Sequence, residues 1–106
     1  MLPGTLALTS EQDALDWIGL CGELGVNHLL AYEDNLPEAF FDLRSGLAGA
    51  LLLKFANYRV RLAMLVSPET ASRGRFGEMA RESNRGNQFG VFSTIKHAEE
   101  WLARGS

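Results

Sequence analysis

The stretch Phe40-Phe41-Asp42-Leu43-Arg44-Ser45-Gly46-Leu47 lies near the centre of the 106-residue chain and decides how the middle of the fold is organised. The hydroxyl of Ser45 can cap a helix start, and Gly46 relieves crowding beside it. Two interpretations fit the sequence: one helix over residues 37–57, or a short turn followed by a second helix from Ser45. Gly46 and Gly49 favour the second, because glycine weakens a helix interior.

Four short apolar segments predict β-strands, because polar, glycine or proline residues bound each of them. They are residues 5–8, 29–32, 60–66 and 89–92. The third is the strongest candidate. Its later part, Leu62–Val66, is apolar without alternation, which is typical of a strand covered on both faces.

Helical spacing of apolar residues predicts helices between the strands. The clearest helix has its apolar stripe at Ala14, Trp17, Ile18, Cys21 and Leu24. Thr9 and Gln12 fit a capping box at its start, and Gly25 is placed to end it. Two more helices are expected, one over about residues 72–83 with Phe76, Met79 and Ala80 inward, and one capped by Ser93 or Thr94 with Ile95, Ala98, Trp101 and Leu102 inward.

The alternation of these elements predicts the fold class. The order is β-α-β-α-β-α-β-α, and such alternation is typical of a mostly parallel sheet with helical crossovers. We therefore expect an α/β fold with a four-stranded, mostly parallel sheet built from βα repeats. A length of 106 residues fits one domain, so residues 1–106 are assigned to a single α/β domain.

Composition and charge argue against several classes of function. The chain has 10 Lys+Arg against 13 Asp+Glu and a net charge of −3, so it offers no evident basic face for nucleic acid. No apolar run is long enough to span a membrane, and the first residues lack the pattern of a signal peptide. The single cysteine, Cys21, can form no disulfide within the chain. We therefore expect a cytoplasmic protein that binds neither nucleic acid nor membranes.

Most of the chain is similar to one known family. The residues that carry the likeness are Leu36–Val66, Glu82-Ser83-Asn84-Arg85-Gly86 and Ala98-Glu99-Glu100-Trp101-Leu102. They resemble a family of small bacterial proteins known only as a domain of unknown function. The resemblance implies a fold and brings no activity with it.

A second resemblance concerns Phe41–Leu47, Leu51 and Arg61-Leu62-Ala63. This pattern is similar to the centre of STAS domains, the anti-sigma-factor antagonists, in which Asp-Ser-Ser-Gly-Leu opens a helix after a strand. The resemblance implies a STAS-like fold. In that family the hydroxyl before the glycine is a regulatory phosphorylation site, and here that position is Ser45. The interval from Asp42 to Ser45 is one residue longer than in STAS domains.

Candidate site residues are expected at the carboxyl ends of the strands, where ligands meet parallel sheets. Residues 33–45 should lie there, together with Ser67-Pro68-Glu69 and Ser93-Thr94. The candidates for binding a ligand or a partner are Asp42, Arg44, Glu33 and Asp34, and the candidate for phosphorylation is Ser45. A structural interpretation stands beside each: Ser45 and Asp42 as caps of a helix or turn, and the acidic residues as a solvated loop.

The remaining polar residues predict no catalytic chemistry. His28 and His97 lie far apart and lack Cys or Glu at metal-ligand spacing. Cys21 lies on an apolar helix stripe, and no histidine pairs with it as a general base would. No glycine-rich phosphate motif is present. We therefore predict no catalytic residue, no cofactor and no metal ion.

Three functions fit this sequence. We favour a non-enzymatic regulatory or protein-interaction module of STAS-like shape, because of the segment Asp42–Leu47 and the lack of catalytic motifs. The alternative is a small ligand-binding domain or enzyme that uses the loops at the carboxyl ends of the strands. A third is self-association, in which exposed apolar residues around Phe40 and Phe41 form a homodimer contact.

Overall fold

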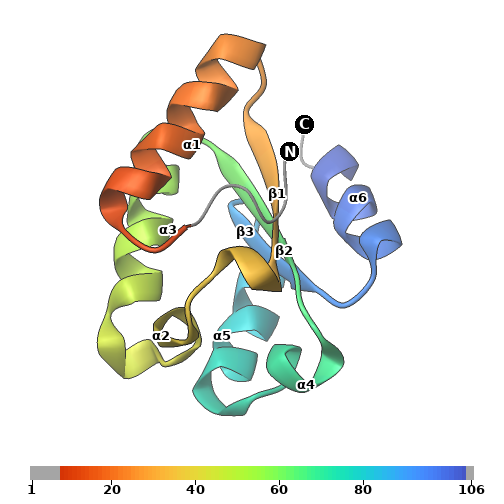
Figure 1. The fold of residues 1–106 in the computed structure, drawn as a ribbon. Coiled ribbons are helices and arrows are strands. Elements are labelled where there is room, and N and C mark those ends of the chain that lie inside the picture. Colours follow the sequence, from red (N-terminus) through yellow and green to blue (C-terminus); the bar gives the residue numbers. More distant parts are fainter. Residues whose placement is uncertain (1–7, 105–106) are drawn as a thin grey trace.

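The computed structural model describes residues 8–104, which form an α/β fold (Figure 1). The strands are β1 (His28–Tyr32), β2 (Arg61–Leu65) and β3 (Phe89–Phe92). They make a three-stranded parallel sheet in the order β1-β2-β3, so the predicted class and parallel pairing are confirmed. The predicted strand at residues 5–8 lies, except for Leu8, outside the described residues.

Helices join the strands and cover both faces of the sheet (Figure 1). The helices and 3₁₀ turns in this part of the chain are α1 (Glu11–Leu24), η1 (Glu33–Asn35), α2 (Glu38–Phe41), η2 (Leu43–Ser45), α3 (Leu47–Asn57), α4 (Pro68–Ala71), α5 (Gly74–Asn84) and α6 (Ile95–Arg104). Among residues 8–104, no helix is both long enough and apolar enough to cross a membrane.

The sheet separates two hydrophobic cores of unequal size. Side chains alternate along β2, so Leu62 and Met64 pack into the larger core with α1, α2, α3 and α5. Ala63 faces the other way and packs against Ala98 and Trp101 of α6. All of β2 from Arg61 to Met64 is buried, which confirms the predicted strand with two covered faces.

The middle of the chain is broken rather than one continuous helix. Residues 37–57 form α2, the turn η2 and then α3. Gly46 separates η2 from α3 with a φ of 79°, a left-handed conformation that strains most other residues. The interpretation with a second helix after Ser45 is therefore confirmed, with α3 beginning at Leu47.

The two phenylalanines of α2 belong to the core. Phe40 is 0% exposed and Phe41 is 7% exposed, and their rings meet edge to face. Both rings also contact Phe76 of α5 in the same manner. The exposure of Phe40 and Phe41 on which the homodimer contact was based is therefore wrong, because packing against α5 covers both side chains. Self-association itself stays a prediction.

The start of α1 differs from the prediction by one residue. Ser10, rather than Thr9, is the N-cap, and its hydroxyl accepts a hydrogen bond from the N–H of Asp13 at 3.2 Å. Thr9 donates from both its N–H and its hydroxyl to the Asp13 carboxylate, at 2.9 and 2.7 Å. The capping box of Thr9 with Gln12 is wrong because Asp13 takes the position that Gln12 would need.

Two further differences lie at the other helices. β2 ends at Leu65, one residue before the predicted end of this strand, and Pro68 opens the short helix α4, whose N-cap is Ser67. The hydroxyl of Thr94 accepts the N–H of His97 and so caps α6. Ile95 is 47% exposed rather than inward, because α6 turns Ala98 and Trp101 toward the sheet instead.

A buried arginine ties α6 to the sheet. Arg61 at the start of β2 is 6% exposed, and its guanidinium donates to the carbonyls of Trp101, Leu102 and Asn87 at 3.0, 2.7 and 2.8 Å. The same group lies over the ring of Trp101, 4.4 Å from its centroid. Two of these carbonyls lie in the last turn of α6, where helix carbonyls lack partners and a cation is favoured.

Asn84 closes the outer side of strand β3. Its side-chain amide donates to the carbonyl of Val91 at 2.8 Å and accepts the N–H of Val91 at 2.7 Å. β3 is an edge strand of the three, and Val91 lies at its middle. The Asn84 side chain therefore occupies the backbone N–H and carbonyl of Val91 that a neighbouring strand would otherwise bond to.

Candidate functional site

The carboxyl ends of the strands lead into η1, α4 and the loop before α6, in the lower half of Figure 1. The Glu33 carboxylate joins two of these segments, because it accepts the N–H of Ser67 and the hydroxyl of Thr70, both at 2.8 Å. The expected meeting of Glu33 with the segment after β2 is therefore present. Its carboxylate fixes the start of α4 to the end of β1, which is a structural task.

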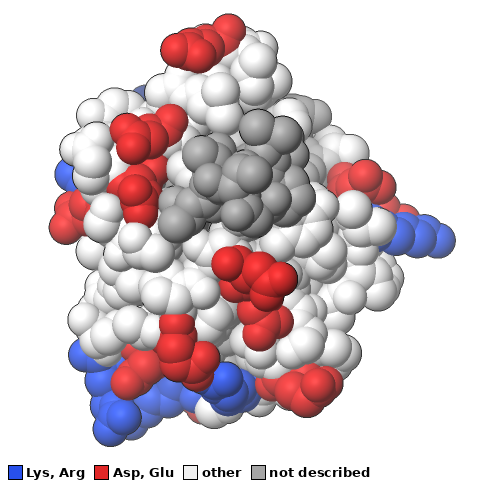
Figure 2. Space-filling view, viewed as in Figure 1, with Lys and Arg blue, Asp and Glu red and all other residues white. Residues whose placement is uncertain are grey.

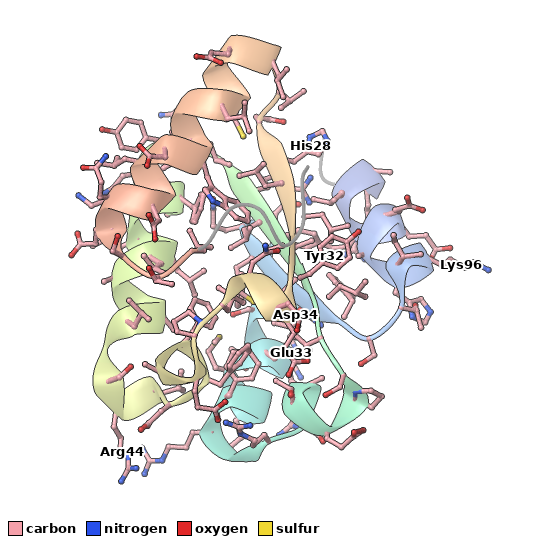
Figure 3. All side chains as sticks on the ribbon, in the orientation of Figure 1. His28, Tyr32, Glu33, Asp34, Arg44 and Lys96 are labelled. Atoms are coloured by element: carbon pink, nitrogen blue, oxygen red, sulfur yellow. The ribbon has the colours of Figure 1, made fainter. Side chains whose placement is uncertain are left out.

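A groove opens at this end of the molecule between the α2–η2 segment and the first turn of α5. It encloses about 660 Å³, and its charged lining residues are Glu38, Asp42, Arg44, Arg73 and Arg75. Phe41 and Phe76 also line it. Figure 2 shows blue and red side chains gathered at the lower left of the molecule, where Figure 3 labels Arg44. We call this feature the arginine groove.

Two of the three arginines in the arginine groove form ion pairs across it or along its wall. Arg73, from the start of α5, bonds to the Glu38 carboxylate of α2, and its guanidinium lies 6.0 Å from the centroid of the Phe41 ring. The Arg44 Nε lies 3.2 Å from Oδ1 of Asp42, and the Arg44 side chain is 88% exposed. These pairs hold the guanidinium groups at the rim while leaving most of their N–H donors to solvent.

Asp42 has a local structural role as well. Its Oδ1 accepts the backbone N–H of Arg44 at 3.1 Å, which makes Asp42 the N-cap of η2. Hydrogen bonds from the Arg44 side chain and then from its backbone hold the pKa of the Asp42 carboxyl below its usual range. The carboxylate therefore stays ionised at neutral pH and is suited to orienting Arg44 rather than to transferring a proton.

Arg75 differs from the other two arginines. It is exposed, and the ion pairs within residues 8–104 join Arg44, Lys54 and Arg73 to carboxylates but do not include Arg75. Its guanidinium therefore has no carboxylate partner among the described residues. Such a group can bind a carboxylate or phosphate with two parallel N–H bonds.

Ser45 lies in the same turn as Asp42 and Arg44. Its hydroxyl donates to the carbonyl of Ala39 at 2.6 Å and accepts the N–H of Leu47 at 3.2 Å. The residue is exposed. Through these two bonds Ser45 links α2 to the first residue of α3, whereas the N-cap of α3 is Gly46, which has no side chain to cap the helix. The expected helix cap at Ser45 is therefore displaced by one residue, and modification of Ser45 by phosphate stays a prediction.

The structure separates the remaining candidates from these residues. Glu33 and Asp34 follow β1 in η1, and neither lines the arginine groove (Figure 3). Asp34 is exposed, in agreement with a solvated position. Of the residues singled out from the sequence, the structure therefore brings Asp42, Arg44 and Ser45 together in one turn and leaves Glu33 and Asp34 outside it.

Sequence reasoning missed Arg73 and Arg75 as site residues. The signal was the segment Ser72-Arg73-Gly74-Arg75, which places two arginines on either side of a glycine at a helix start. A helix start with basic residues runs against the usual preference for acidic ones, because the N-terminus of a helix carries partial positive charge. An unfavourable placement of this kind was a usable hint of function.

The histidines and the cysteine lie away from the arginine groove. Cys21 is buried in α1, and burial raises the pKa of its thiol above the usual range. His97 is exposed on α6 and lies 2.9 Å from the Thr94 hydroxyl. His28 is exposed at the start of β1, as Figure 3 shows. Across residues 8–104, no three His, Cys, Asp or Glu side chains are grouped as metal ligands.

The sequence profile of one family matches this chain. The family is described as Domain of unknown function (DUF4180), and the match covers residues 3–102. The chain belongs to this family. The match takes in every strand and helix described above, except for the last two residues of α6. No curated protein and no solved structure matches the chain significantly.

Proposed function

We propose that the protein is a non-enzymatic, cytoplasmic regulatory module that binds a protein partner at the arginine groove. The observation that carries this proposal is the set of three guanidinium groups at one open rim, one of them free of internal ion pairs. Arginine keeps its charge at every physiological pH, so such a rim recognises anions and does not transfer protons. An acidic segment of a partner is the occupant that this charge complements.

The open shape of the groove supports a partner over a small substrate. The groove lies on the surface between α2 and α5, and the Asp42 carboxylate at its wall is already bonded to Arg44. A small ligand-binding domain or enzyme would call for a deep pocket that encloses its ligand. Glu33, the other carboxylate expected in such a pocket, is bonded to Ser67 and Thr70 instead.

Affinity capture with matched variants tests the proposal. Arg75→Glu reverses a charge at the groove, and Arg81→Glu reverses an exposed charge on the same helix outside the groove. Immobilised wild type and Arg81→Glu should retain the same partner from native extract, as measured by quantitative mass spectrometry, and Arg75→Glu should lose it. Equal retention by all three proteins, or no retained partner, contradicts the proposal.

The regulatory part of the proposal concerns Ser45 and rests on the likeness to STAS domains. Phosphorylation would remove the hydroxyl proton that bonds to Ala39 and would add negative charge next to Arg44. The turn that carries Asp42 and Arg44 would then shift, and the groove would change with it. Capture by Ser45→Asp should fall below capture by Ser45→Ala; equal capture by the two variants argues against a switch.

A further inference from the structure

The charge balance of the arginine groove limits the kind of anion that it can accept. Three guanidinium groups line it, and two carboxylates, those of Glu38 and Asp42, are bonded to two of them. The lining therefore carries one net positive charge. A ligand with one negative charge would neutralise it, and a dianion would leave one charge uncompensated beside two fixed carboxylates.

The internal ion pairs also determine which arginine is left to bind. Asp42 uses Nε of Arg44, and Glu38 uses Nη2 of Arg73, so each of these guanidinium groups already shares its positive charge with a carboxylate. Arg75 has no such partner among the described residues. Its planar fork of donors matches the two oxygens of a carboxylate, which can accept two parallel N–H bonds.

We infer that the arginine groove recognises one carboxylate, carried by an aspartate or glutamate of the partner segment, with Arg75 as its anchor. This inference rests on the proposed function, since it names the chemistry of the partner at the same site. Glu38 and Asp42 act as built-in competitors that reject phosphorylated or highly acidic segments. Arg44 and Arg73 stay bound to these carboxylates and supply the surrounding positive rim.

The test uses three capped alanine pentapeptides whose central residue is glutamate, glutamine or phosphoserine. Each is titrated into labelled protein while the Nε–H signals of the arginines are followed by NMR. The glutamate peptide should shift the Arg75 signal in a saturable way, and the glutamine peptide should leave it unchanged. Arg75→Gln should weaken glutamate-peptide binding by about two- to fivefold, the range that exposed ion pairs give.

Removing one competitor should change the selectivity. Glu38→Gln raises the net positive charge of the groove by one, so the phosphoserine peptide should then bind more tightly than the glutamate peptide. Glu99→Gln, an exposed change on α6, is the control and should leave the order of affinities as in the wild type. Phosphoserine binding at least as tight as glutamate binding in the wild type overturns the inference, as does equal binding of the glutamate and glutamine peptides.

The outcomes separate this inference from the proposal on which it rests. Loss of the captured partner in Arg75→Glu, together with preference for the phosphoserine peptide in the wild type, keeps the groove as the interaction surface and refutes the single-carboxylate chemistry. If Arg75→Glu still retains the partner, the groove is refuted as the interaction surface, irrespective of the peptide affinities.

Discussion

Replacing Arg61 with methionine removes the donors that hold α6 against the sheet and keeps most of the length of the side chain. In the native protein the guanidinium bonds to three carbonyls and lies over Trp101. The carbonyls of Trp101 and Leu102 would lose their side-chain donor in the last turn of α6. α6 is the one helix described on this face of the sheet, so its attachment depends heavily on that contact (Figure 1).

The expected loss of stability follows from these contacts. Each hydrogen bond from a charged donor contributes roughly 1.5 kcal/mol at the lower end of its range. The cation–π contact adds about 1 kcal/mol. Methionine does not carry the desolvation cost of a buried guanidinium, and this difference offsets about 2 kcal/mol of the lost stabilisation. We therefore expect Arg61→Met to lower the free energy of unfolding by about 3.5 kcal/mol, a large part of the roughly 5–15 kcal/mol of a typical domain.

Equilibrium unfolding in urea, followed by far-UV circular dichroism and tryptophan fluorescence, measures this change. Arg81→Met removes an exposed arginine of α5 and should alter the free energy of unfolding by less than about 0.5 kcal/mol. Arg61→Lys keeps the charge without the planar fork and should fall between the two. A loss below about 1 kcal/mol for Arg61→Met would refute the reasoning, because the three bonds could not then be worth their ordinary value.

Three further results are expected. Gly77→Ala should destabilise the protein by about 2 kcal/mol in the same assay, because the added Cβ would lie 2.7 Å from the backbone carbon of Ser72. Gly19→Ala lies in open space within α1 and should stabilise the protein by roughly 0.5–1 kcal/mol. The reverse order of stabilities would contradict this packing. The Cys21 thiol, whose pKa is raised by burial, should react with iodoacetamide about tenfold or more slowly in the folded protein than in urea, and equal rates would contradict its burial. The pKa of Asp13 is lowered chiefly by the Thr9 hydroxyl, so its carboxylate stabilises the fold above the ordinary aspartate pKa and loses this effect as the pH falls. The difference in unfolding free energy between wild type and Asp13→Asn should therefore shrink between roughly pH 5 and pH 2. A constant difference over this range would count against the Thr9–Asp13 hydrogen bond.

The elements that sequence reasoning found are those whose signal is local. The unbroken apolar run Leu62–Val66 predicted a strand with two covered faces, and β2 is buried in this way. Gly46 and Gly49 favoured a break in the middle segment, and Gly46 provides it with a left-handed turn. The exact cap of α1 was missed because Thr9 and Ser10 are both good N-caps, and the cap is the residue whose hydroxyl accepts the backbone N–H of Asp13, here Ser10.

The features that were missed depend on contacts between distant residues. Glu38 and Arg73 form an ion pair across 35 positions of sequence, and no local pattern reveals it. Arg61 bonds to carbonyls that lie 40 and 41 positions away. The sequence left open whether Phe40 and Phe41 lie on the surface, because the residue that covers them, Phe76, comes from another helix. The turn of Asp42, Arg44 and Ser45 was predicted as a site from local residues, but the other wall of the arginine groove was not.

The amide of Asn84 has a consequence for how copies of this protein behave toward one another. An edge strand with a free N–H and carbonyl at its centre is a template on which a second chain can extend the sheet, and long arrays of this kind lead to fibrils. Asn84 occupies both groups of Val91 with a side chain of the same molecule. It blocks strand addition at the centre of the β3 edge, because a second chain could extend the sheet through Val91 only after these two bonds had broken.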